Sequence, residues 1–209
     1  VSFLKELSIK RIPVTISGAR TGVTGGAVPF GGVLISTENL NRKLEVCKDK
    51  GIAKVSCNVR LKEIEEAALK EGFMYPVDPT EKDAFIGGNI ATNASGAKSF
   101  KFGSTRDYVI SLRVVLADGD MLRIKRGEYI CNRDSTLRIS TQAGRPLDFK
   151  LPSYKMPAIK NAAGYFVMEK MDLIDLFIWQ EGTVCIITEA ELRLVKSPKN
   201  IICILSFFE

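Results

Sequence analysis

The stretch from Pro13 to Gly32 places the strongest constraint on how this chain can fold. A short run rich in β-branched residues, Val14 to Ser17, leads into a glycine-rich loop, and a second apolar run follows from Val33 to Ser36. The pattern predicts a strand, a glycine loop and a second strand. Glycine lets the backbone come close to a ligand, and successive backbone N–H groups can converge on an anion. The loop is therefore either a diphosphate-binding loop or a mobile surface connection.

The loop does not match the common phosphate-binding motifs. The P-loop motif is excluded because the pair Gly25-Gly26 is followed by alanine and valine, and no G-x-G-x-x-G opens a helix here. The side chains of the loop nevertheless suit an anion. Ser17, Thr21 and Thr24 offer hydroxyl groups, and Arg20 offers a fixed positive charge.

Composition excludes several classes of function. At 209 residues with 45% hydrophobic composition, the chain can bury a core in one or two subdomains. The net charge of +6 is scattered, apart from Arg123 to Arg126, and this favours a solvated face over a nucleic-acid surface. Histidine is absent, which removes the usual general base and the commonest metal ligand.

Cysteine usage and hydropathy indicate where the protein resides. The 5 cysteines show no C-x-x-C spacing, which favours a reduced, intracellular protein. No apolar run reaches the length of a transmembrane helix, and the N-terminus lacks the layout of a signal peptide. We therefore expect a cytoplasmic protein, peripheral to a membrane only through a partner.

Local patterns predict a mixed α/β chain. The expected elements are a helix over 1–10 with Phe3, Leu4 and Leu7 on one face, a hairpin over 44–58, a helix over 61–71 with Leu61, Ile64, Ala67, Ala68 and Leu69 inward, a strand pair over 109–116 and 121–124, a helix over 171–179, and a strand over 184–194. The segment 125–157 is expected to be the least regular. The chain opens inside a helix and closes in a strand-like run over 201–208, which suggests a domain from a longer protein.

A second unusual stretch runs from Asp78 to Gly103. Small and hydroxyl residues dominate it, and they cannot build a core by themselves. One interpretation is a long irregular loop with a short helical turn. The other, which we favour, is a second wall of the same ligand site, because long structureless loops in compact domains are usually functional or disordered.

Five segments in a fixed order resemble one protein family. They are Gly18–Pro29, Asp78–Thr80, Gly87–Gly96, Phe102–Asp107 and Glu181–Glu189. Together they resemble the PCMH-type FAD-binding domain of the vanillyl-alcohol oxidase superfamily. The most similar branch contains the bacterial glycolate oxidase FAD subunit and the D-lactate and D-2-hydroxyglutarate dehydrogenases. The resemblance covers nearly the whole chain, and its motifs are specific in combination rather than singly.

The resemblance implies an α+β fold in which two α/β subdomains hold FAD between them. Residues 1–108 would form the first subdomain with the diphosphate loop, residues 109–198 the second, and residues 199–209 the start of a linker to a substrate domain. That substrate domain, and a first strand expected before Val1, are not in this sequence. Since the substrate domain supplies most catalytic groups of the family, no catalytic residue is assigned in this chain.

The resemblance also implies which residues bind FAD. Ser17 to Val23 would hold the diphosphate through backbone amides, the 78–83 and 93–96 segments would line the flavin and diphosphate, and 181–187 would face the adenosine or the flavin edge. The implied residues are Ser17, Gly18, Ala19, Arg20, Thr21, Gly22, Val23, Gly26, Asp78, Pro79, Thr80, Gly87, Gly88, Thr92, Asn93, Ser95, Gly96, Glu181, Gly182, Val184 and Ile187. Without histidine a histidyl–flavin bond is impossible, so FAD is expected to bind noncovalently.

The sequence departs from the family pattern at two places. Many relatives have a run of glycines where this chain has Gly18-Ala19-Arg20, so Arg20 either pairs with the diphosphate or crowds it. Trp179-Gln180 stands where relatives often have a small pair, which alters the shape of that pocket wall. The segment 160–165 resembles a family segment that packs near the flavin, but we assign Lys160 no role.

The family implies an FAD-dependent oxidoreductase that oxidises a small 2-hydroxy acid. Hydride would pass to flavin N5, and electrons would then pass to a quinone, a partner protein or oxygen; no nucleic acid or metal is expected. Two alternatives remain: a non-catalytic nucleotide-binding fragment, or another branch of the superfamily that makes ether lipids or oxidises sugar lactones. As an isolated chain it is expected to be inactive and to bind FAD weakly or not at all.

Overall fold

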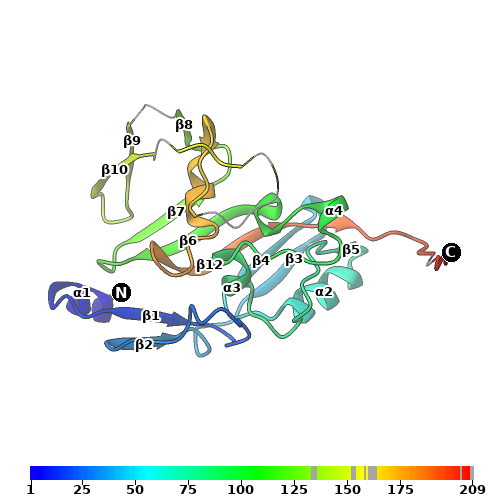
Figure 1. Ribbon diagram of the computed structural model, residues 1–209, viewed down its shortest axis with the longest axis horizontal. Helices are drawn as coiled ribbons and strands as arrows, with labels where there is room; N and C mark the ends of the chain where they lie inside the picture. The colour runs from blue at the N-terminus through cyan, green and yellow to red at the C-terminus, as the bar shows by residue number, and fades with distance from the viewer. Residues whose placement is uncertain (133–135, 152–153, 158, 160–163, 203, 208–209) are drawn as a thin grey trace.

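A five-stranded antiparallel sheet crosses the middle of the molecule (Figure 1). The computed structural model describes residues 1–132, 136–151, 154–157, 159, 164–202 and 204–207. The strand order is β3-β4-β12-β6-β7, with β3 at Leu44–Cys47, β4 at Ile52–Ser56, β6 at Val109–Leu116, β7 at Met121–Lys125 and β12 at Cys185–Arg193. Strands from both sides of position 108 therefore share one sheet, and the subdomain division at that position stays a prediction.

One face of this sheet forms the core of the molecule. Along β12 the residues Cys185, Ile187, Ala190 and Leu192 are buried, and a register shift between Ile187 and Glu189 keeps them on the same side. Such a bulge admits one extra residue into the strand without turning the apolar set to solvent. The predicted strands over 109–116, 121–124 and 184–194 are confirmed within one residue at their ends.

The helix predicted over 61–71 packs against this core. It is α2, Leu61–Lys70, and Leu61, Ile64 and Ala68 are buried. Burying a side chain of this size stabilises the fold by about 1.5–3 kcal/mol relative to leaving it exposed. The expectation that Leu69 also faces inward was wrong, since it is 56% exposed.

The strand–loop–strand prediction for the N-terminal stretch is confirmed. Strands β1, Val14–Ser17, and β2, Val33–Ser36, form a separate parallel pair, with Val14 opposite Val33. Parallel neighbours require a crossover connection, and the glycine loop supplies it without a helix. Helix α1, Ser2–Ile9, lies beside this pair at the lower left of Figure 1. Leu4 and Leu7 are buried as expected, but Phe3 is 53% exposed.

The hairpin predicted over 44–58 is also confirmed. Strands β3 and β4 are joined by a short 3₁₀ helix, η1, Lys48–Lys50, and by Gly51 in the left-handed region at φ 60°. Cys47 lies opposite Ile52, so Cys47 and Cys57 are not cross-strand partners, in agreement with their sequence spacing.

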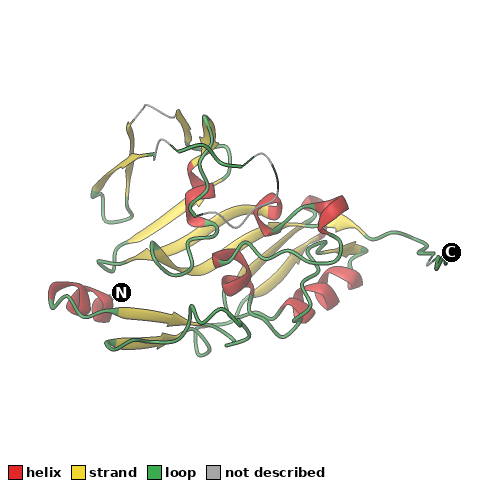
Figure 2. Cartoon of the chain, viewed as in Figure 1, coloured by secondary structure: helices red, strands yellow, loops and turns green. Residues whose placement is uncertain are grey.

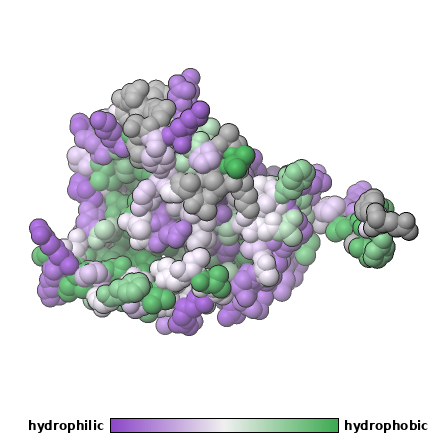
Figure 3. All heavy atoms as spheres, viewed as in Figure 1, coloured by the Kyte–Doolittle hydropathy of each residue, from purple (hydrophilic) through white to green (hydrophobic). Residues whose placement is uncertain are grey.

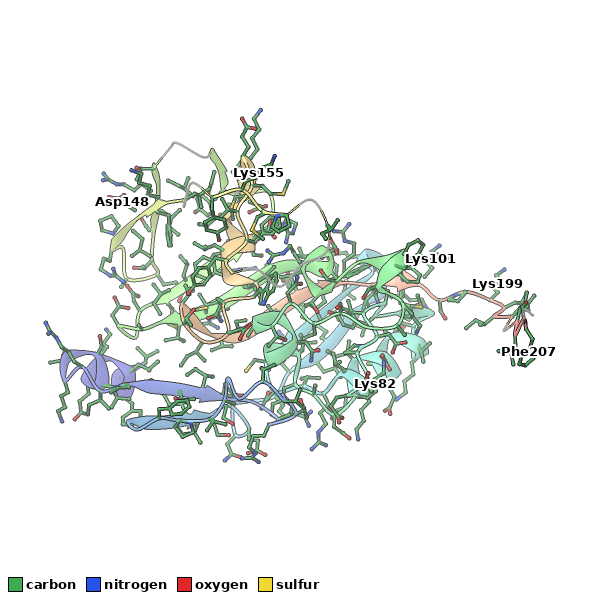
Figure 4. All side chains as sticks on the ribbon, viewed as in Figure 1. Lys82, Lys101, Asp148, Lys155, Lys199 and Phe207 are labelled. Atoms are coloured by element: carbon green, nitrogen blue, oxygen red, sulfur yellow. The ribbon has the colours of Figure 1, made fainter. Side chains whose placement is uncertain are left out.

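The segment 125–157 is more regular than the sequence indicates. It contains β8, Ile130–Asn132, β9, Thr136–Ser140, and β10, Pro146–Lys150, and the last two form an antiparallel hairpin. The expectation of an irregular segment was wrong because cross-strand pairs, such as Arg138 with Asp148, stabilise short polar strands that lack apolar periodicity. Figure 4 places Asp148 on the outer hairpin, far from Lys82.

The helix predicted over 171–179 is replaced by two shorter elements. Strand β11, Lys170–Asp172, pairs with β8, and a 3₁₀ helix, η3, follows at Leu173–Phe177. The change occurs at Asp172, whose carboxylate accepts hydrogen bonds from the backbone N–H groups of Ile174 and Gly127. Leu173 and Phe177 are buried, and Leu176 is half-buried.

The segment from Asp78 to Gly103 carries two short helices rather than one turn. They are α3, Ile86–Ala91, and α4, Ser99–Phe102, and both appear as red turns in Figure 2. A 3₁₀ helix, η2, Thr105–Tyr108, then leads into β6. Two strands of two residues each form a further antiparallel pair, namely β5, Phe73–Met74, and β13, Val195–Lys196.

Three further expectations from the sequence concern the 201–208 run, membrane-spanning helices and metal sites. The described residues of the 201–208 run have no regular secondary structure, so the strand-like expectation was wrong for them. None of the helices in the described ranges is long and apolar enough to cross a membrane. Likewise, the described side chains include no group of three or more His, Cys, Asp or Glu residues arranged to hold a metal ion.

Candidate functional site

One cavity lies between the glycine loop, α3 and the start of β12, and a second cavity beside it shares part of its lining. The first encloses about 210 Å³ and the second about 1410 Å³. Four residues line both cavities, namely Gly22, Thr24, Thr92 and Glu181, and we call this set the neck. Figure 3 shows apolar atoms gathered in the recess between the β1–β2 pair and the main sheet. A single elongated ligand could therefore pass through the neck and occupy both spaces.

The walls of the two cavities differ in origin. The first is bounded by the glycine loop, by α3 and by β12, with Ile16, Phe85 and Ile187 as apolar contacts. The second is bounded by the tip of the glycine loop, by the 92–107 segment and by described residues between Tyr154 and Glu169. Polar residues such as Asn93, Ser95 and Lys155 line the second cavity together with apolar ones such as Phe166 and Met168.

Arg20 forms an ion pair within the chain, and whether it pairs with a diphosphate or crowds it stays a prediction. Its guanidinium nitrogen Nη2 lies 3.1 Å from Glu38 Oε1 and 3.2 Å from Oε2, and both side chains are exposed. The backbone at Arg20 has φ 60°, in the left-handed region that glycine tolerates best. Arg20 thus lines the first cavity while its charge is paired with a carboxylate. Its backbone holds a strained left-handed conformation that a glycine would adopt without strain.

Replacing Arg20 tests both its ion pair with Glu38 and its left-handed backbone conformation. We expect Arg20→Gly to raise the free energy of unfolding by about 1 kcal/mol, because the left-handed strain is removed. An exposed ion pair contributes at most about 1 kcal/mol, so FAD affinity should change less than about fivefold. Urea unfolding and calorimetry with FAD measure the two effects, with Arg42→Gly, at an ordinary φ, as the contrasting variant. A tenfold or larger change in affinity would contradict this assignment.

Two adjacent glycines of α3 have different surroundings. A Cβ built on Gly87 would lie 2.7 Å from the Cβ of Cys57, so Gly87 is required by packing. A Cβ on Gly88 would meet no protein atom within 4 Å, and its φ is one that any residue adopts. Gly88 nevertheless lines the first cavity. Since neither packing nor backbone conformation requires glycine there, the free space at Gly88 fits a bound ligand.

A strained turn forms the wall that separates the cavities. Trp179 has φ 72°, Glu181 has φ 49° and Gly182 has φ 82°. The turn is attached to the end of α3, because the N–H groups of Trp179 and Glu181 donate to the carbonyls of Ile90, at 3.0 Å, and Ala91, at 2.9 Å. Non-glycine residues in this region cost about 1–3 kcal/mol each and persist only where the surroundings hold them.

The side chain of Gln180 holds the turn from inside. It is 2% exposed, and its Oε1 accepts from the N–H groups of Val184, at 3.0 Å, and Cys185, at 3.4 Å. Its Nε2 donates to the Cys185 carbonyl at 3.2 Å. The Trp179 indole donates to Glu181 Oε1 at 3.2 Å, which orients that carboxylate at the neck. The Trp179-Gln180 pair, a departure from the family pattern, therefore makes specific contacts.

Asp78 takes part in an ion-pair network outside both cavities. Its carboxylate accepts from Lys82, and its Oδ2 lies 3.1 Å from Lys98 Nζ. Hydrogen bonding by Lys82, followed by Lys98, lowers the pKa of Asp78 below its ordinary value. Its carbonyl accepts from the N–H of Ala97 at 3.1 Å, so Asp78 joins the 78–83 loop to the segment after Gly96.

This network makes a pH-dependent contribution to stability. Because the folded-state pKa of Asp78 is depressed, the contribution is present above the unfolded-state pKa of about 3.9 and is lost as pH falls from that value through the lower folded-state pKa. We expect Asp78→Asn to lower the free energy of unfolding by about 1 kcal/mol at neutral pH, and by progressively less as pH falls below about 4. Urea unfolding at several pH values measures this, with Asp49→Asn in an exposed turn as control. A cost that is independent of pH would contradict the assignment.

The structure brings together most, but not all, of the residues that the resemblance implies. Those lining the first cavity are Gly18, Ala19, Arg20, Thr21, Gly22, Gly26, Gly87, Gly88, Thr92, Glu181, Gly182 and Ile187. Those lining the second are Gly22, Val23, Thr92, Asn93, Ser95 and Glu181. Ser17, Asp78, Pro79, Thr80, Gly96 and Val184 line neither cavity. The assignment of all these residues to a ligand stays a prediction, and Lys160 to Ala163 lie outside the described residues.

Several lining residues were not assigned to the cofactor from the sequence. They include Thr37, Cys57, Phe85, Asn89, Gln180 and Cys185 in the first cavity and Arg106 in the second. Burial raises the pKa of the Cys57 thiol to about 11 and that of Cys185 to about 12. Both thiols are therefore protonated at neutral pH and are poor nucleophiles. Thr37, Cys57 and Phe85 lie outside the motif segments of the family resemblance, so only the fold brings them to the cavity.

Comparison with known proteins agrees with this geometry. Residues 1–125 match the sequence profile of a family described as FAD binding domain. The chain belongs to this FAD-binding domain family. It is 37% identical over 207 residues to D-lactate dehydrogenase of Anaerostipes hadrus, which covers 99% of this chain and 36% of that protein. It is 33% identical over 201 residues to glycolate oxidase subunit GlcD of Bacillus subtilis, covering 95% and 35%.

Solved structures support the same fold for this FAD-binding domain. An alkyldihydroxyacetonephosphate synthase matches 95% of the chain and 32% of its own, with a TM-score of 0.66 and 20% identity. A 6-hydroxy-D-nicotine oxidase from Arthrobacter nicotinovorans matches 94% and 34%, with a TM-score of 0.63 and 13% identity. The chain thus spans about a third of the length of the curated relatives it matches. The expected fold class and superfamily are confirmed.

The residues present fit an FAD molecule. A dinucleotide has two ring systems separated by a diphosphate, and two cavities joined at a neck match that shape. The glycine loop borders the neck through Gly22, which has no protein atom within 4 Å of a built Cβ. At the base of the loop the hydroxyl of Ser17 is buried without a hydrogen-bond partner among the described residues. The open space at Gly22 leaves an unfilled contact at the neck, where a diphosphate would lie, whereas Ser17 lines neither cavity.

Proposed function

We propose that this chain binds FAD with its diphosphate at the neck and one ring system in each cavity. The observation that carries this proposal is the overlap of the two cavities at Gly22, Thr24, Thr92 and Glu181. The smaller first cavity suits the adenine, and the larger second cavity suits the isoalloxazine ring. Backbone N–H groups of the glycine loop would bind the diphosphate, since glycine allows the close approach that an anion needs.

The FAD is noncovalent in this proposal. Histidine is absent from the sequence. Two of the cysteines, Cys57 and Cys185, line the first cavity, where the adenine would lie rather than the reactive ring. Their raised pKa values keep them protonated at neutral pH, so neither is disposed to bond with a flavin.

We further propose that the whole protein is an FAD-dependent oxidoreductase for a small 2-hydroxy acid. The support is the identity to relatives named D-lactate dehydrogenase and glycolate oxidase subunit GlcD. When bound, FAD supplies the redox chemistry by accepting hydride, while the protein binds and orients it. This chain contributes the cofactor site, and the substrate and the electron acceptor are contacted by parts of the protein beyond it. Such a protein would act in the cytoplasm or against a membrane-bound partner.

Calorimetry of the 209-residue chain with FAD, ADP and FMN tests the cofactor proposal. Because FAD joins the two halves covalently, it should bind at least about tenfold more tightly than either ADP or FMN alone. Equal affinity for FAD and ADP would mean that the second cavity does not take the isoalloxazine ring. Absence of binding by all three would contradict the proposal for this chain. Turnover of D-lactate, glycolate and D-2-hydroxyglutarate by the whole protein tests the substrate class.

A further inference from the structure

A cluster of two arginines and one aspartate lies next to the wall between the cavities, with Arg106 and Asp175 buried and Arg126 half-buried. Arg106 on η2 is 9% exposed, and its Nη1 donates to the carbonyl of Asp175 at 2.7 Å and to its Oδ1 at 3.1 Å. Arg126 Nη2 lies 3.0 Å from Asp175 Oδ1, and its Nη1 lies 3.2 Å from Oδ2. Thus two guanidinium groups share one carboxylate on η3, and burial makes these contacts strong.

Arg106 extends beyond the cluster to the strained turn. Its Nη2 donates to the carbonyl of Ile178 at 2.9 Å, directly before Trp179. Its own backbone N–H donates to Asn93 Oδ1 at 2.9 Å, and its guanidinium lies 4.2 Å from the ring centroid of Phe166. Arg126 has no such contact with the turn, because its other hydrogen bonds go to the carbonyls of Val109 and Arg106. Arg106 therefore connects the second cavity's walls to the turn, whereas Arg126 supports Arg106 from behind.

From these contacts we infer that Arg106 is a positioning residue for the turn 178–182. The turn holds two non-glycine residues in the left-handed region, so it needs fixed contacts on both sides. The end of α3 and Gln180 hold its Trp179–Glu181 part, and the Arg106 fork holds the carbonyl at its start. Since the turn places Glu181 at the neck, Arg106 sets the shape of the passage between the cavities through the turn, in addition to lining the second cavity itself. This inference rests on the proposed function only where FAD is used as the probe.

Trp179 makes the inference testable without any ligand. It is the single tryptophan of the chain and it lies on the turn. In Arg106→Lys the charge is kept, but an ammonium cannot reproduce the planar fork that reaches two carbonyls at once. Arg126→Lys is the matched control, because it alters the same cluster without touching the turn. The experiment measures far-ultraviolet circular dichroism, acrylamide quenching of Trp179 and FAD binding for the 209-residue chain and both variants.

We expect Arg106→Lys to keep its secondary structure while acrylamide quenching of Trp179 rises at least twofold and FAD affinity falls at least tenfold. Arg126→Lys should change each value less than twofold. Unchanged Trp179 quenching in folded Arg106→Lys, or equal changes in both variants, would overturn the inference. If the unaltered chain binds no FAD, the proposed function fails, and the inference is decided by quenching alone.

A second variant covers the case in which Arg106→Lys does not fold. Asp175→Asn keeps the carbonyl and one side-chain oxygen that Arg106 contacts, but it removes the charge that anchors the fork. Acrylamide quenching of Trp179 should then also rise, by a smaller factor than is expected for Arg106→Lys. Quenching identical to that of the unaltered chain in folded Asp175→Asn would overturn the inference in that case.

Discussion

Gly88→Ala should stabilise the chain and weaken its binding of FAD at the same time. Glycine inside a helix costs about 0.5–1 kcal/mol relative to alanine, and nothing in the surroundings of Gly88 opposes a methyl group. The free energy of unfolding without ligand should therefore rise by that amount. The added methyl group would occupy space at the wall of the first cavity, where overpacking costs about 1–3 kcal/mol. FAD affinity should accordingly fall by about 5- to 150-fold.

Urea unfolding without ligand and calorimetry with FAD separate the two effects. Gly22→Ala serves as a companion variant, because a Cβ there also meets no protein atom and Gly22 lies at the neck. It should weaken FAD binding in the same direction. Binding of FAD by Gly88→Ala with the affinity of the unaltered chain would place the ligand elsewhere. A loss of stability would mean that the helix needs glycine for a reason other than the ligand.

Gly96→Ala should prevent stable folding. A Cβ at this position would lie 1.6 Å from the carbonyl oxygen of Asp78, 2.1 Å from its carbonyl carbon and 2.5 Å from the nitrogen of Pro79. All three are backbone atoms, and the Asp78 loop is fixed by its ion pairs with Lys82 and Lys98, so the clash cannot be relieved by a side-chain rotation. We expect a loss of about 3 kcal/mol or more in the free energy of unfolding.

The same substitution at Gly88 is the control, because it differs only in the space available. Soluble expression, thermal unfolding and urea unfolding measure the difference between the two variants. If Gly96→Ala folds normally and only FAD binding is lost, then Gly96 is a cofactor residue, as the family resemblance implies, and the packing explanation is wrong. If it fails to fold, Gly96 is required for the close packing of its own segment against the backbone of Asp78 and Pro79, outside both cavities.

These two glycines illustrate how far the sequence could be interpreted. Gly88 and Gly96 belong to one motif, and spacing alone gives them the same role. The structure separates them because only three-dimensional packing determines which glycine faces a neighbouring backbone and which faces free space. The alternating apolar patterns of β6, β7 and β12, by contrast, were sufficient to predict strands, because burial on one sheet face leaves a period of two in the sequence.

Contacts between distant segments could not be predicted. Arg106 and Asp175 are separated by 69 positions, and each is an ordinary charged residue when considered alone. The same holds for the strained turn, since Trp179 and Glu181 are not residues that propensity places in the left-handed region. Their conformation is imposed by Gln180, by the end of α3 and by Arg106. The glycine loop was the exception. Its glycines and hydroxyl residues lie close together in the sequence, so the loop could be predicted without knowing any distant contact.

The position of β12 within the sheet bears on how the chain acquires its structure. It lies between β4 and β6 and pairs with both, although it is formed by residues 185–193. Until that segment is available, the β3–β4 and β6–β7 hairpins have no common partner, and each exposes an unpaired strand edge. Pairing at such sequence separation slows folding and leaves edges open to association. Residues 1–125, which suffice for the family match, should therefore not fold by themselves and should aggregate when produced alone.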